Sequence, residues 1–338
     1  MSKPLVSIIT PCYNGEKYIS NFLDSVISQT YPSVELIIID DGSTDGTKSI
    51  IESKRYYFEK KGYKLVYLYQ ENQGQAAAVN LGLKVFNGEY LMWVDSDDVL
   101  YEENISKKVE FLEKNPDYGF VLCKAERVNE NDLDFPLEII GRSRPAGDDN
   151  LFKDILLFKL DCYAGINMVR RTSILKSIPS LHIYEGREGQ NFQLFLPLAH
   201  MYKCGYIEDV LCKIVTHKDS HSQKKRKYDQ LVSRRRGMCD IQIHTIDNLV
   251  DMSFEDKEYW KNVIEIDYQK AILYLSIINF KGKSAKESKE LIIRLGGTID
   301  FIDDVLKSYF FAVIRFAAII KNKLITLIKR ILKNDKYN

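Results

Sequence analysis

Hydrophobic and polar residues follow two different periods along the first 130 residues of the chain. Short apolar runs rich in β-branched residues, typical of buried strands, alternate with longer segments whose apolar positions recur every three or four residues, as in amphipathic helices. The predicted strands cover residues 5–10, 34–40, 64–70, 89–95 and 118–128. The predicted helices cover residues 16–29, 44–61, 74–86 and 102–115. This alternation predicts an α/β fold with a mostly parallel sheet that helices cover on both faces.

The pattern is less regular after this part of the chain. Residues 129–136 and 141–150 have the composition of loops, and apolar character returns at residue 151. Residues 163–177 and 189–209 predict an extension of the sheet and a further helix that complete the domain. Residues 230–300 have a helical pattern.

Composition narrows the class of protein. The chain has 338 residues, of which 45% are hydrophobic and 28% charged, as in an ordered globular protein. Its net charge of +1 provides no basic field that would favour nucleic acid. The six cysteines form no Cys-x-x-Cys pair, which argues against a disulfide framework or a structural zinc site and favours a reducing compartment. The N-terminus lacks the apolar segment of a signal peptide, so we expect a cytoplasmic protein.

Polar loops follow four of the predicted strands. These loops are residues 10–15, 40–46, 70–74 and 95–98. Each one alone could be a turn or a helix cap, because Asn-Gly and Asp-Gly are common turn dipeptides and Asp caps helices. Parallel sheets, however, bind ligands at the carboxyl ends of their strands, so four such loops on one edge indicate a site. Residues 95–98, with the sequence DSDD, place three carboxylates together, and a divalent cation would relieve their repulsion.

The motifs in these loops resemble those of family 2 glycosyltransferases. They are VSIITPCYNGEKYI, ELIIIDDGSTDGT, ENQGQAAAVNLGL and GEYLMWVDSDD, within residues 4–100, and the resemblance continues more weakly to about residue 222. It implies the GT-A fold, a Rossmann-like mixed sheet with flanking helices. We expect a GT-A domain with a donor half and an acceptor half, then a helical extension and a basic tail. The expected ranges are 1–225 for the domain, 1–125 and 126–225 for its halves, 226–300 for the extension and 301–338 for the tail.

The resemblance also implies the reaction, an inverting transfer of a sugar from a nucleotide sugar with Mn²⁺ or Mg²⁺ as cofactor. Asp97 is the expected metal ligand. Asp95 is expected at the metal site or at the ribose, and His217 is expected to complete the coordination or to touch the diphosphate. For Asp98, the preferred interpretation is a cap of the following helix.

The resemblance places the nucleotide sugar over the first loops. Its expected contacts are Pro11, Tyr13, Asp41, Gln75, Asp95 and Ser96. Pro11 and Tyr13 line the base pocket, and Asp41 accepts a hydrogen bond from the base, which favours UDP or dTDP over GDP. Asp40 is expected to support its own loop. Gln75 stands where many family members have a basic residue near the donor phosphates.

The general base is the main departure from the family pattern. Many members have a Glu-Asp pair at the start of a helix, where this chain has Gln190 and Asn191. Neither amide can accept a proton from the acceptor hydroxyl, so we expect Glu188 to be the base, with Glu185 as the alternative. Both could instead be loop carboxylates favoured by the helix dipole. A third interpretation is a protein that binds a sugar nucleotide without transferring the sugar.

The last residues suggest where the protein works. Residues 301–338 carry eight Lys and Arg against three Asp, a net charge of +5, in an apolar background. Lys307 and Arg315 interrupt this background, so a basic amphipathic helix on a membrane surface fits better than a spanning one. The alternative is a helix packed on protein. We expect a peripheral protein on the inner face of the cell membrane, acting on a glycan or lipid-linked acceptor in surface polysaccharide synthesis.

Two other enzyme classes are disfavoured. Nucleotidyltransferases of similar fold have a glycine-rich loop with Arg and Lys after the first strand, which residues 10–18 lack. Rossmann dehydrogenases need a Gly-x-Gly-x-x-Gly motif there, and none is present.

Overall fold

The computed structural model describes residues 3–141, 151–160, 163–186, 189–217, 226–279 and 281–299. The chain forms two compact units. Met1–Lys225 and Gly237–Ile264 make up the first unit, and Arg226–Arg236 and Glu265–Asn338 make up the second.

A mixed sheet of nine strands, counted over the described residues, organises the first unit. The parallel part has the order β3-β2-β1-β4 and comprises β1 (Val6–Cys12), β2 (Val34–Asp41), β3 (Lys64–Gln70) and β4 (Tyr90–Trp93). The order continues as β8-β6-β9-β5, with β8 antiparallel to both β4 and β6, and β5 antiparallel to β9. The strands of this part are β5 (Val99–Leu100), β6 (Tyr118–Asn129), β7 (Asp132–Ile140), β8 (Asn167–Arg170) and β9 (Lys203–Thr216). The predicted mixed α/β sheet is thereby confirmed.

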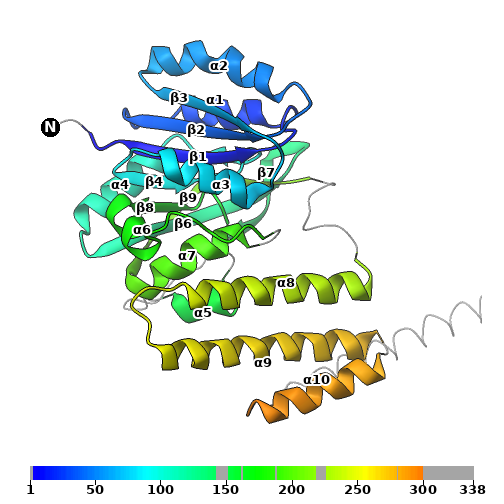
Figure 1. Ribbon diagram of the computed structural model, residues 1–338. Coiled ribbons are helices and arrows are strands. Elements are labelled where there is room, and N and C mark those ends of the chain that lie inside the picture. Colours follow the sequence, from blue (N-terminus) through cyan, green and yellow to red (C-terminus); the bar gives the residue numbers. More distant parts are fainter. Residues whose placement is uncertain are drawn as a thin grey trace, which may run out of the picture. The chain divides into compact units, whose positions relative to one another are not determined.

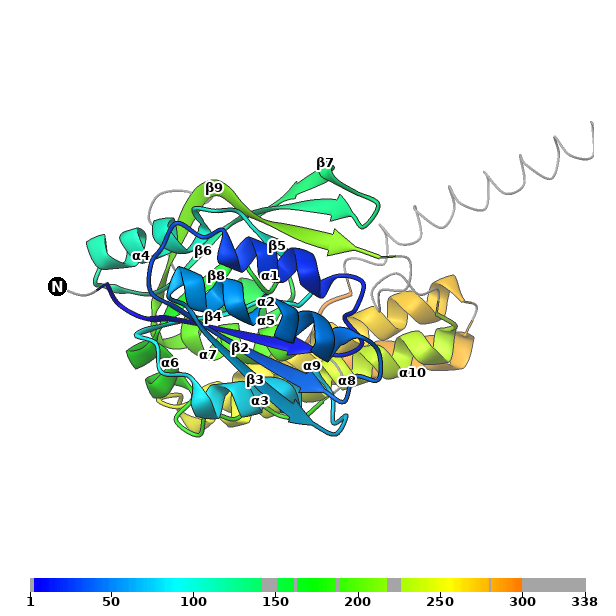
Figure 2. The same ribbon diagram turned by 90° about the horizontal axis from the view of Figure 1, so that it is seen from above.

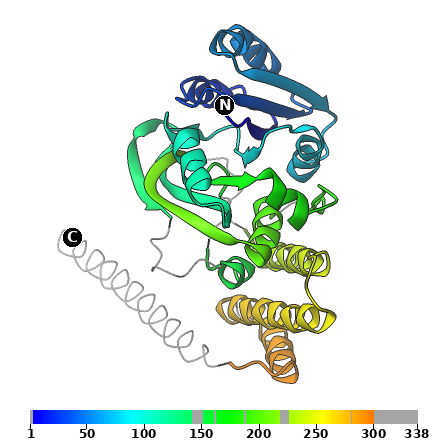
Figure 3. The same cartoon turned by 90° about the vertical axis from the view of Figure 1, so that its left-hand side faces the viewer.

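Helices cover both faces of the parallel strands. The helices up to residue 201 are α1 (Ile19–Ile27), α2 (Thr47–Lys61), α3 (Gln75–Val85), α4 (Asn104–Lys114), α5 (Phe152–Leu156), α6 (Arg171–Ser177) and α7 (Gln190–Met201). The chain moves from β1 to β2 to β3 and then returns past them to β4. Right-handed crossovers therefore place α1 and α2 on one face and α3 on the other (Figures 1 and 3).

The core lies between these layers. Every residue of β1 and β2 is buried, which explains why their sequences are continuous apolar runs instead of alternating ones. Each Ile or Val buried in this way contributes roughly 1.5–3 kcal/mol to folding. Gly82 lets α3 approach the sheet, since a Cβ there would lie 2.5 Å from Cγ2 of Ile9.

The region after residue 129 differs from the prediction. Residues 132–140 form strand β7, which pairs with β6 on the side away from β9 (Figure 2), although part of this stretch reads as a loop. Its apolar side chains Phe135, Leu137 and Ile139 are exposed, so the sequence lacks the continuous apolar run that predicts a buried strand. Residues 163–177 provide the expected sheet extension as β8, followed by the short helix α6.

The predicted helices after residue 226 are present as α8 (Tyr228–Asp247), α9 (Phe254–Ile278) and α10 (Gly282–Arg294). Within the second unit, the Tyr228 hydroxyl lies 2.8 Å from that of Ser276, and Arg235 donates a hydrogen bond to Asp267. The tail, residues 301–338, lies outside the described residues. No described helix has the length and apolar character that a membrane span requires.

Candidate active site

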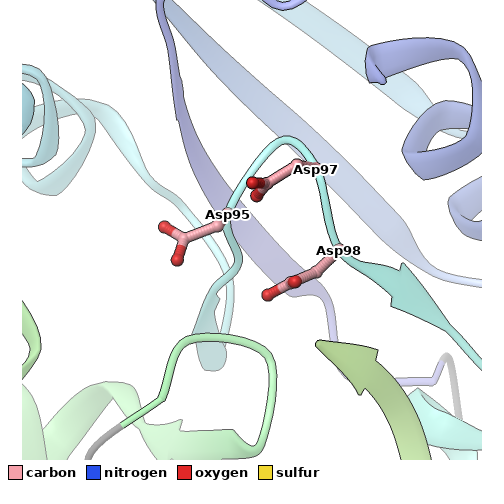
Figure 4. A group of neighbouring side chains, drawn as sticks. All are labelled: Asp95, Asp97 and Asp98. Carbon is pink, nitrogen blue, oxygen red and sulfur yellow. The ribbon is translucent and has the colours of Figure 1, made fainter. Parts of the chain in front are cut away.

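The acidic loop, which we define as residues 95–98, connects β4 to β5. One carboxylate oxygen from each of Asp95, Asp97 and Asp98 lies within 4.8 Å of the others. Figure 4 shows that the three side chains project to the same side of the loop. The turn closes through a hydrogen bond from the Asp98 amide to the Asp95 carbonyl oxygen. The cluster predicted from the sequence is therefore present at the carboxyl end of β4.

The protonation of this cluster reflects its crowding. Burial, with the adjacent charge of Asp97, raises the pKa of Asp95 to about 7. The same two causes raise the pKa of Asp98 well above its ordinary value. A divalent cation would favour the ionised forms again, because carboxylate oxygens are ligands that both Mn²⁺ and Mg²⁺ prefer, and an imidazole beside them suits Mn²⁺ better than Mg²⁺. The residues present therefore fit the metal ion that the resemblance implies.

Asp98 does not cap a helix, so the preferred interpretation of this residue was wrong. Its Oδ1 accepts a hydrogen bond from the backbone N–H of Val215 in β9, at 3.0 Å. Helix α4 begins only at Asn104, because strand β5 intervenes. Asp98 instead connects the acidic loop to strand β9.

His217 comes directly after β9 and lies beside the acidic loop. Its Nε2 is 2.7 Å from Oδ2 of Asp97, and this hydrogen bond is the main reason that the pKa of His217 is raised. The Tyr18 ring stacks on the imidazole with a centroid separation of 3.9 Å. On the other side, Nδ1 lies 3.7 Å from Oε2 of Glu130. The fold thus brings His217 to Asp97, with which it is expected to bind the metal, and to Tyr18 and Glu130, whose contacts with it the sequence did not indicate.

Reciprocal hydrogen bonds join the loop after β1 to the loop after β2. Asn14 shows the pattern: its N–H donates to Oγ of Ser43, and its Oδ1 accepts from the N–H of Thr44. Further bonds of this kind run from the N–H of Gly15 to Thr47, from the N–H of Glu16 to Asp45 and from the N–H of Gly46 to Glu16. Pro11, within β1, is buried, whereas Tyr13, in the loop that follows β1, is half exposed.

The two carboxylates at the end of β2 both hold loops. Asp40 accepts hydrogen bonds from the Ser43 amide and the Tyr67 hydroxyl, which confirms the predicted loop support. Asp41 is buried, and its Oδ1 accepts from the Gln70 side chain and the Gln73 amide. Its Oδ2 accepts from the Gly74 amide. Asp41 therefore also fixes the loop that leads into α3.

Gln75 and Ser96 each contact a neighbour in the site. Gln75, the first residue of α3, donates from Nε2 to Oδ1 of Asp95 at 2.9 Å. The Ser96 side chain hydrogen-bonds the Cys12 thiol, whose pKa burial raises to about 12. These contacts connect the acidic loop to the start of α3 and to the end of β1.

The segment before α7 is held by two buried amide side chains. Asn80 exchanges two hydrogen bonds with the main chain of Ile183, at 2.8 and 2.9 Å. Gln193 exchanges two with the main chain of Tyr184, at 2.7 and 3.0 Å. We call Ile183 and Tyr184 the clamped segment.

The predicted bases lie next to this segment. The Glu185 carboxylate, about half exposed, accepts from Asn80 Nδ2 at 3.3 Å and lies 3.5 Å from the His182 ring. Glu188 lies outside the described residues. Gln190 and Asn191 form the first turn of α7, after Gly189 in the left-handed conformation.

Comparisons with known proteins identify the family. The sequence model of glycosyl transferase family 2 matches residues 7–178, about half of the chain. An uncharacterised glycosyltransferase of Rickettsia prowazekii is 40% identical over 129 residues, which are 38% of each protein. The putative teichuronic acid biosynthesis glycosyltransferase TuaG of Bacillus subtilis is 43% identical over 110 residues, 32% of this chain and 42% of TuaG. The chain therefore spans less than half the length of these relatives.

Solved structures agree with the fold. TarS of S. aureus (residues 1–349, in complex with UDP-GlcNAc) has a TM-score of 0.57 and 22% identity, over 78% of this chain and 72% of that one. The mannosyltransferase PcManGT of Pyrobaculum calidifontis, in complex with GDP-Man and Mn²⁺, has a TM-score of 0.57 and 17% identity, over 93% and 81% of the two chains. The sheet, its flanking helices and the match to the family model lead to one conclusion: the chain is a member of glycosyl transferase family 2 with the GT-A fold.

Proposed function

We propose that this protein transfers a sugar, with inversion, from a UDP- or dTDP-linked donor to a glycan or lipid-linked acceptor, with the help of Mn²⁺ or Mg²⁺. The observation that carries the proposal is the convergence of Asp95, Asp97 and His217 at the carboxyl edge of the sheet. Asp97 and His217 would hold the metal ion directly, and Asp95 would hold it or a water bound to it. The bound cation would neutralise charge on the departing diphosphate.

The first loops would hold the nucleotide. Tyr13 is 55% exposed, so its ring could stack on a base, and hydrogen bonds from the adjacent Asn14 to the loop after β2 would fix its position. Each carboxylate oxygen can accept about two hydrogen bonds, and Oδ2 of Asp41 accepts one from the Gly74 amide. Asp41 could thus bond the imide N–H of uracil or thymine while it holds the loop after β3. TarS with bound UDP-GlcNAc supports a uridine donor, whereas PcManGT, with bound GDP-Man, is a counterexample.

Transfer requires a base on the acceptor side. Glu188 would take the proton from the acceptor hydroxyl, and Glu185 is the alternative. For Glu185, support comes from its position beside the clamped segment, where Asn80 holds both its carboxylate and the main chain of Ile183. Gln75 would keep Asp95 oriented by donating to its Oδ1.

The setting would be surface polysaccharide synthesis at the inner face of the membrane. The similarity to TuaG, whose name assigns it to teichuronic acid biosynthesis, supports this setting. The +5 charge of residues 301–338 would draw them to anionic lipids, at about 1 kcal/mol per cation near the surface. Deletion of residues 301–338 should then abolish binding to anionic vesicles, and unchanged binding would contradict this part.

Calorimetry tests the central proposal. UDP, dTDP and GDP are titrated into the full chain with and without Mn²⁺, and into Asp97→Ala. We expect Mn²⁺ to strengthen the binding of UDP or dTDP at least tenfold, and Asp97→Ala to remove this gain. Asp24→Ala is the control, because Asp24 is an exposed aspartate paired with Lys54. Equal binding with and without metal would refute the proposal.

A second candidate is a protein that binds a sugar nucleotide but does not transfer the sugar. Gln190 and Asn191, at the position of the acidic pair, favour it. Transfer and hydrolysis assays on wild type, Glu188→Gln and Glu185→Gln separate the two. If wild type turns over and one of these variants does not, the protein is an enzyme and the replaced residue is its base. If wild type binds the donor without any turnover, the second candidate is supported.

A further inference from the structure

The His217 ring lies between two carboxylates. Nε2 is 2.7 Å from Oδ2 of Asp97, and Nδ1, on the opposite side of the ring, is 3.7 Å from Oε2 of Glu130. The side chain is only 9% exposed. The two nitrogens therefore face different parts of the protein, one the acidic loop and the other the turn between β6 and β7.

Glu130 is itself held in place from two directions. The Tyr18 hydroxyl donates to Oε2 of Glu130 at 2.8 Å, and the Glu130 amide donates to the carbonyl oxygen of Thr216 at 3.1 Å. Because Thr216 immediately precedes His217, the carboxylate and the imidazole are anchored to each other through the main chain. Tyr18 also stacks on the imidazole, so it fixes both partners at once.

This arrangement has a chemical consequence for a metal ligand. A histidine that binds a metal through one nitrogen carries its proton on the other, and a carboxylate that faces this second nitrogen sets the tautomer and the ring orientation. Here the carboxylate of Glu130 faces Nδ1, which would leave Nε2 with its lone pair toward the acidic loop. A partly buried carboxylate is costly without such an interaction, and the Glu130 side chain is only 16% exposed.

We propose that Glu130, held by Tyr18, is the positioning residue that orients His217 for metal binding. The inference rests on the proposed function, because it assumes a cation at Asp97 and His217. Glu130 does not touch the metal ion in this proposal, and it acts only through the imidazole.

Mn²⁺ binding measured by electron paramagnetic resonance tests the inference on the full chain with UDP. In wild type, pulsed spectra should show nitrogen coupling to Mn²⁺, and His217→Ala should abolish this coupling. Glu130→Ala should weaken Mn²⁺ binding 10- to 100-fold and reduce the coupling, in line with other residues that orient metal ligands. Glu130→Gln, whose amide oxygen can still accept from Nδ1–H, should recover part of the loss.

Two further variants separate orientation from folding. Tyr18→Phe keeps the stacked ring and removes only the hydroxyl, so it should weaken binding less than Glu130→Ala does. Glu138→Gln, in the same hairpin but paired with Arg127, should leave Mn²⁺ binding unchanged. If Glu130→Ala and Tyr18→Phe both bind Mn²⁺ within twofold of the wild-type affinity and show full nitrogen coupling, the inference about Glu130 is wrong, but the proposed function is unaffected. A wild-type protein that binds no Mn²⁺ would overturn the proposed function as well.

Discussion

The Asp98 carboxylate accepts a hydrogen bond from the main chain of Val215, a residue 117 positions further along the chain. Val215 precedes His217 by two residues, so this bond fixes the segment that brings the imidazole to Asp97. The Asp98 carboxylate thus holds the segment that carries His217 against the acidic loop. The arrangement has a cost, because the Asp98 carboxylate is buried next to two others.

We therefore expect that asparagine can replace Asp98 without loss of stability. In Asp98→Asn, the side-chain oxygen can still accept from Val215, while the cost of ionising a carboxyl that is buried beside Asp95 and Asp97 is removed. With EDTA at pH 7.5, we expect the variant to be more stable than wild type by about 1–3 kcal/mol in urea denaturation, the usual range for an imperfectly satisfied buried group. Asp98→Ala loses the bond and should be less stable than Asp98→Asn. An Asn variant less stable than wild type would contradict this account.

Stability should depend on pH through Asp95. Its folded pKa of about 7 exceeds the ordinary value of 3.8, so the folded protein holds an extra proton between these limits. The contribution of this group to the free energy of unfolding is present at low pH and decreases as the pH rises through that window. Asp95→Asn removes the contribution, so its stability relative to wild type should increase from pH 4.5 to pH 7.5 in EDTA. A difference that does not change with pH would show that Asp95 titrates normally.

The clamped segment allows a test at the level of single amides. The Ile183 N–H donates to Asn80 and the Tyr184 N–H to Gln193. Asn80→Ala should accelerate hydrogen exchange at Ile183 at least tenfold, with a smaller effect at Tyr184, and Gln193→Ala should do the reverse. Residue-resolved exchange measured by NMR checks both. Equal acceleration at both amides in each variant would mean that the segment opens as a unit.

Two glycines should respond in opposite ways to alanine. A Cβ at Gly82 would lie 2.5 Å from Ile9 and 3.0 Å from Ile39, so Gly82→Ala should destabilise the protein by about 1–3 kcal/mol. Gly237, inside helix α8, has no atom within 4 Å of an added Cβ, so Gly237→Ala should stabilise by about 0.5–1 kcal/mol. Chemical denaturation checks both, and a neutral Gly82→Ala would contradict the close packing of α3 on the sheet.

The sequence was informative where structure is determined locally. Strands buried on both faces, such as β1 and β2, have unmistakable apolar runs, and the loops after them are marked by turn dipeptides and clustered carboxylates. The contacts that depend on the return of distant segments were not predictable. Glu130 and Tyr18 are 112 residues apart, so no local sequence pattern indicates that they meet. Asp98 was assigned to a helix cap because its partner, Val215, belongs to a strand that the local pattern does not connect to it.

The hold on Ile183 and Tyr184 has an implication for how freely this stretch can vary in sequence. Asn80 and Gln193 hold Ile183 and Tyr184 by their peptide groups, which every residue type supplies except for the missing N–H of proline. Substitutions at Tyr184 and at the neighbouring His182 would therefore leave the course of this stretch intact while changing the side chains it presents. The side chains of this stretch can therefore change while the hydrogen bonds that hold its backbone are kept.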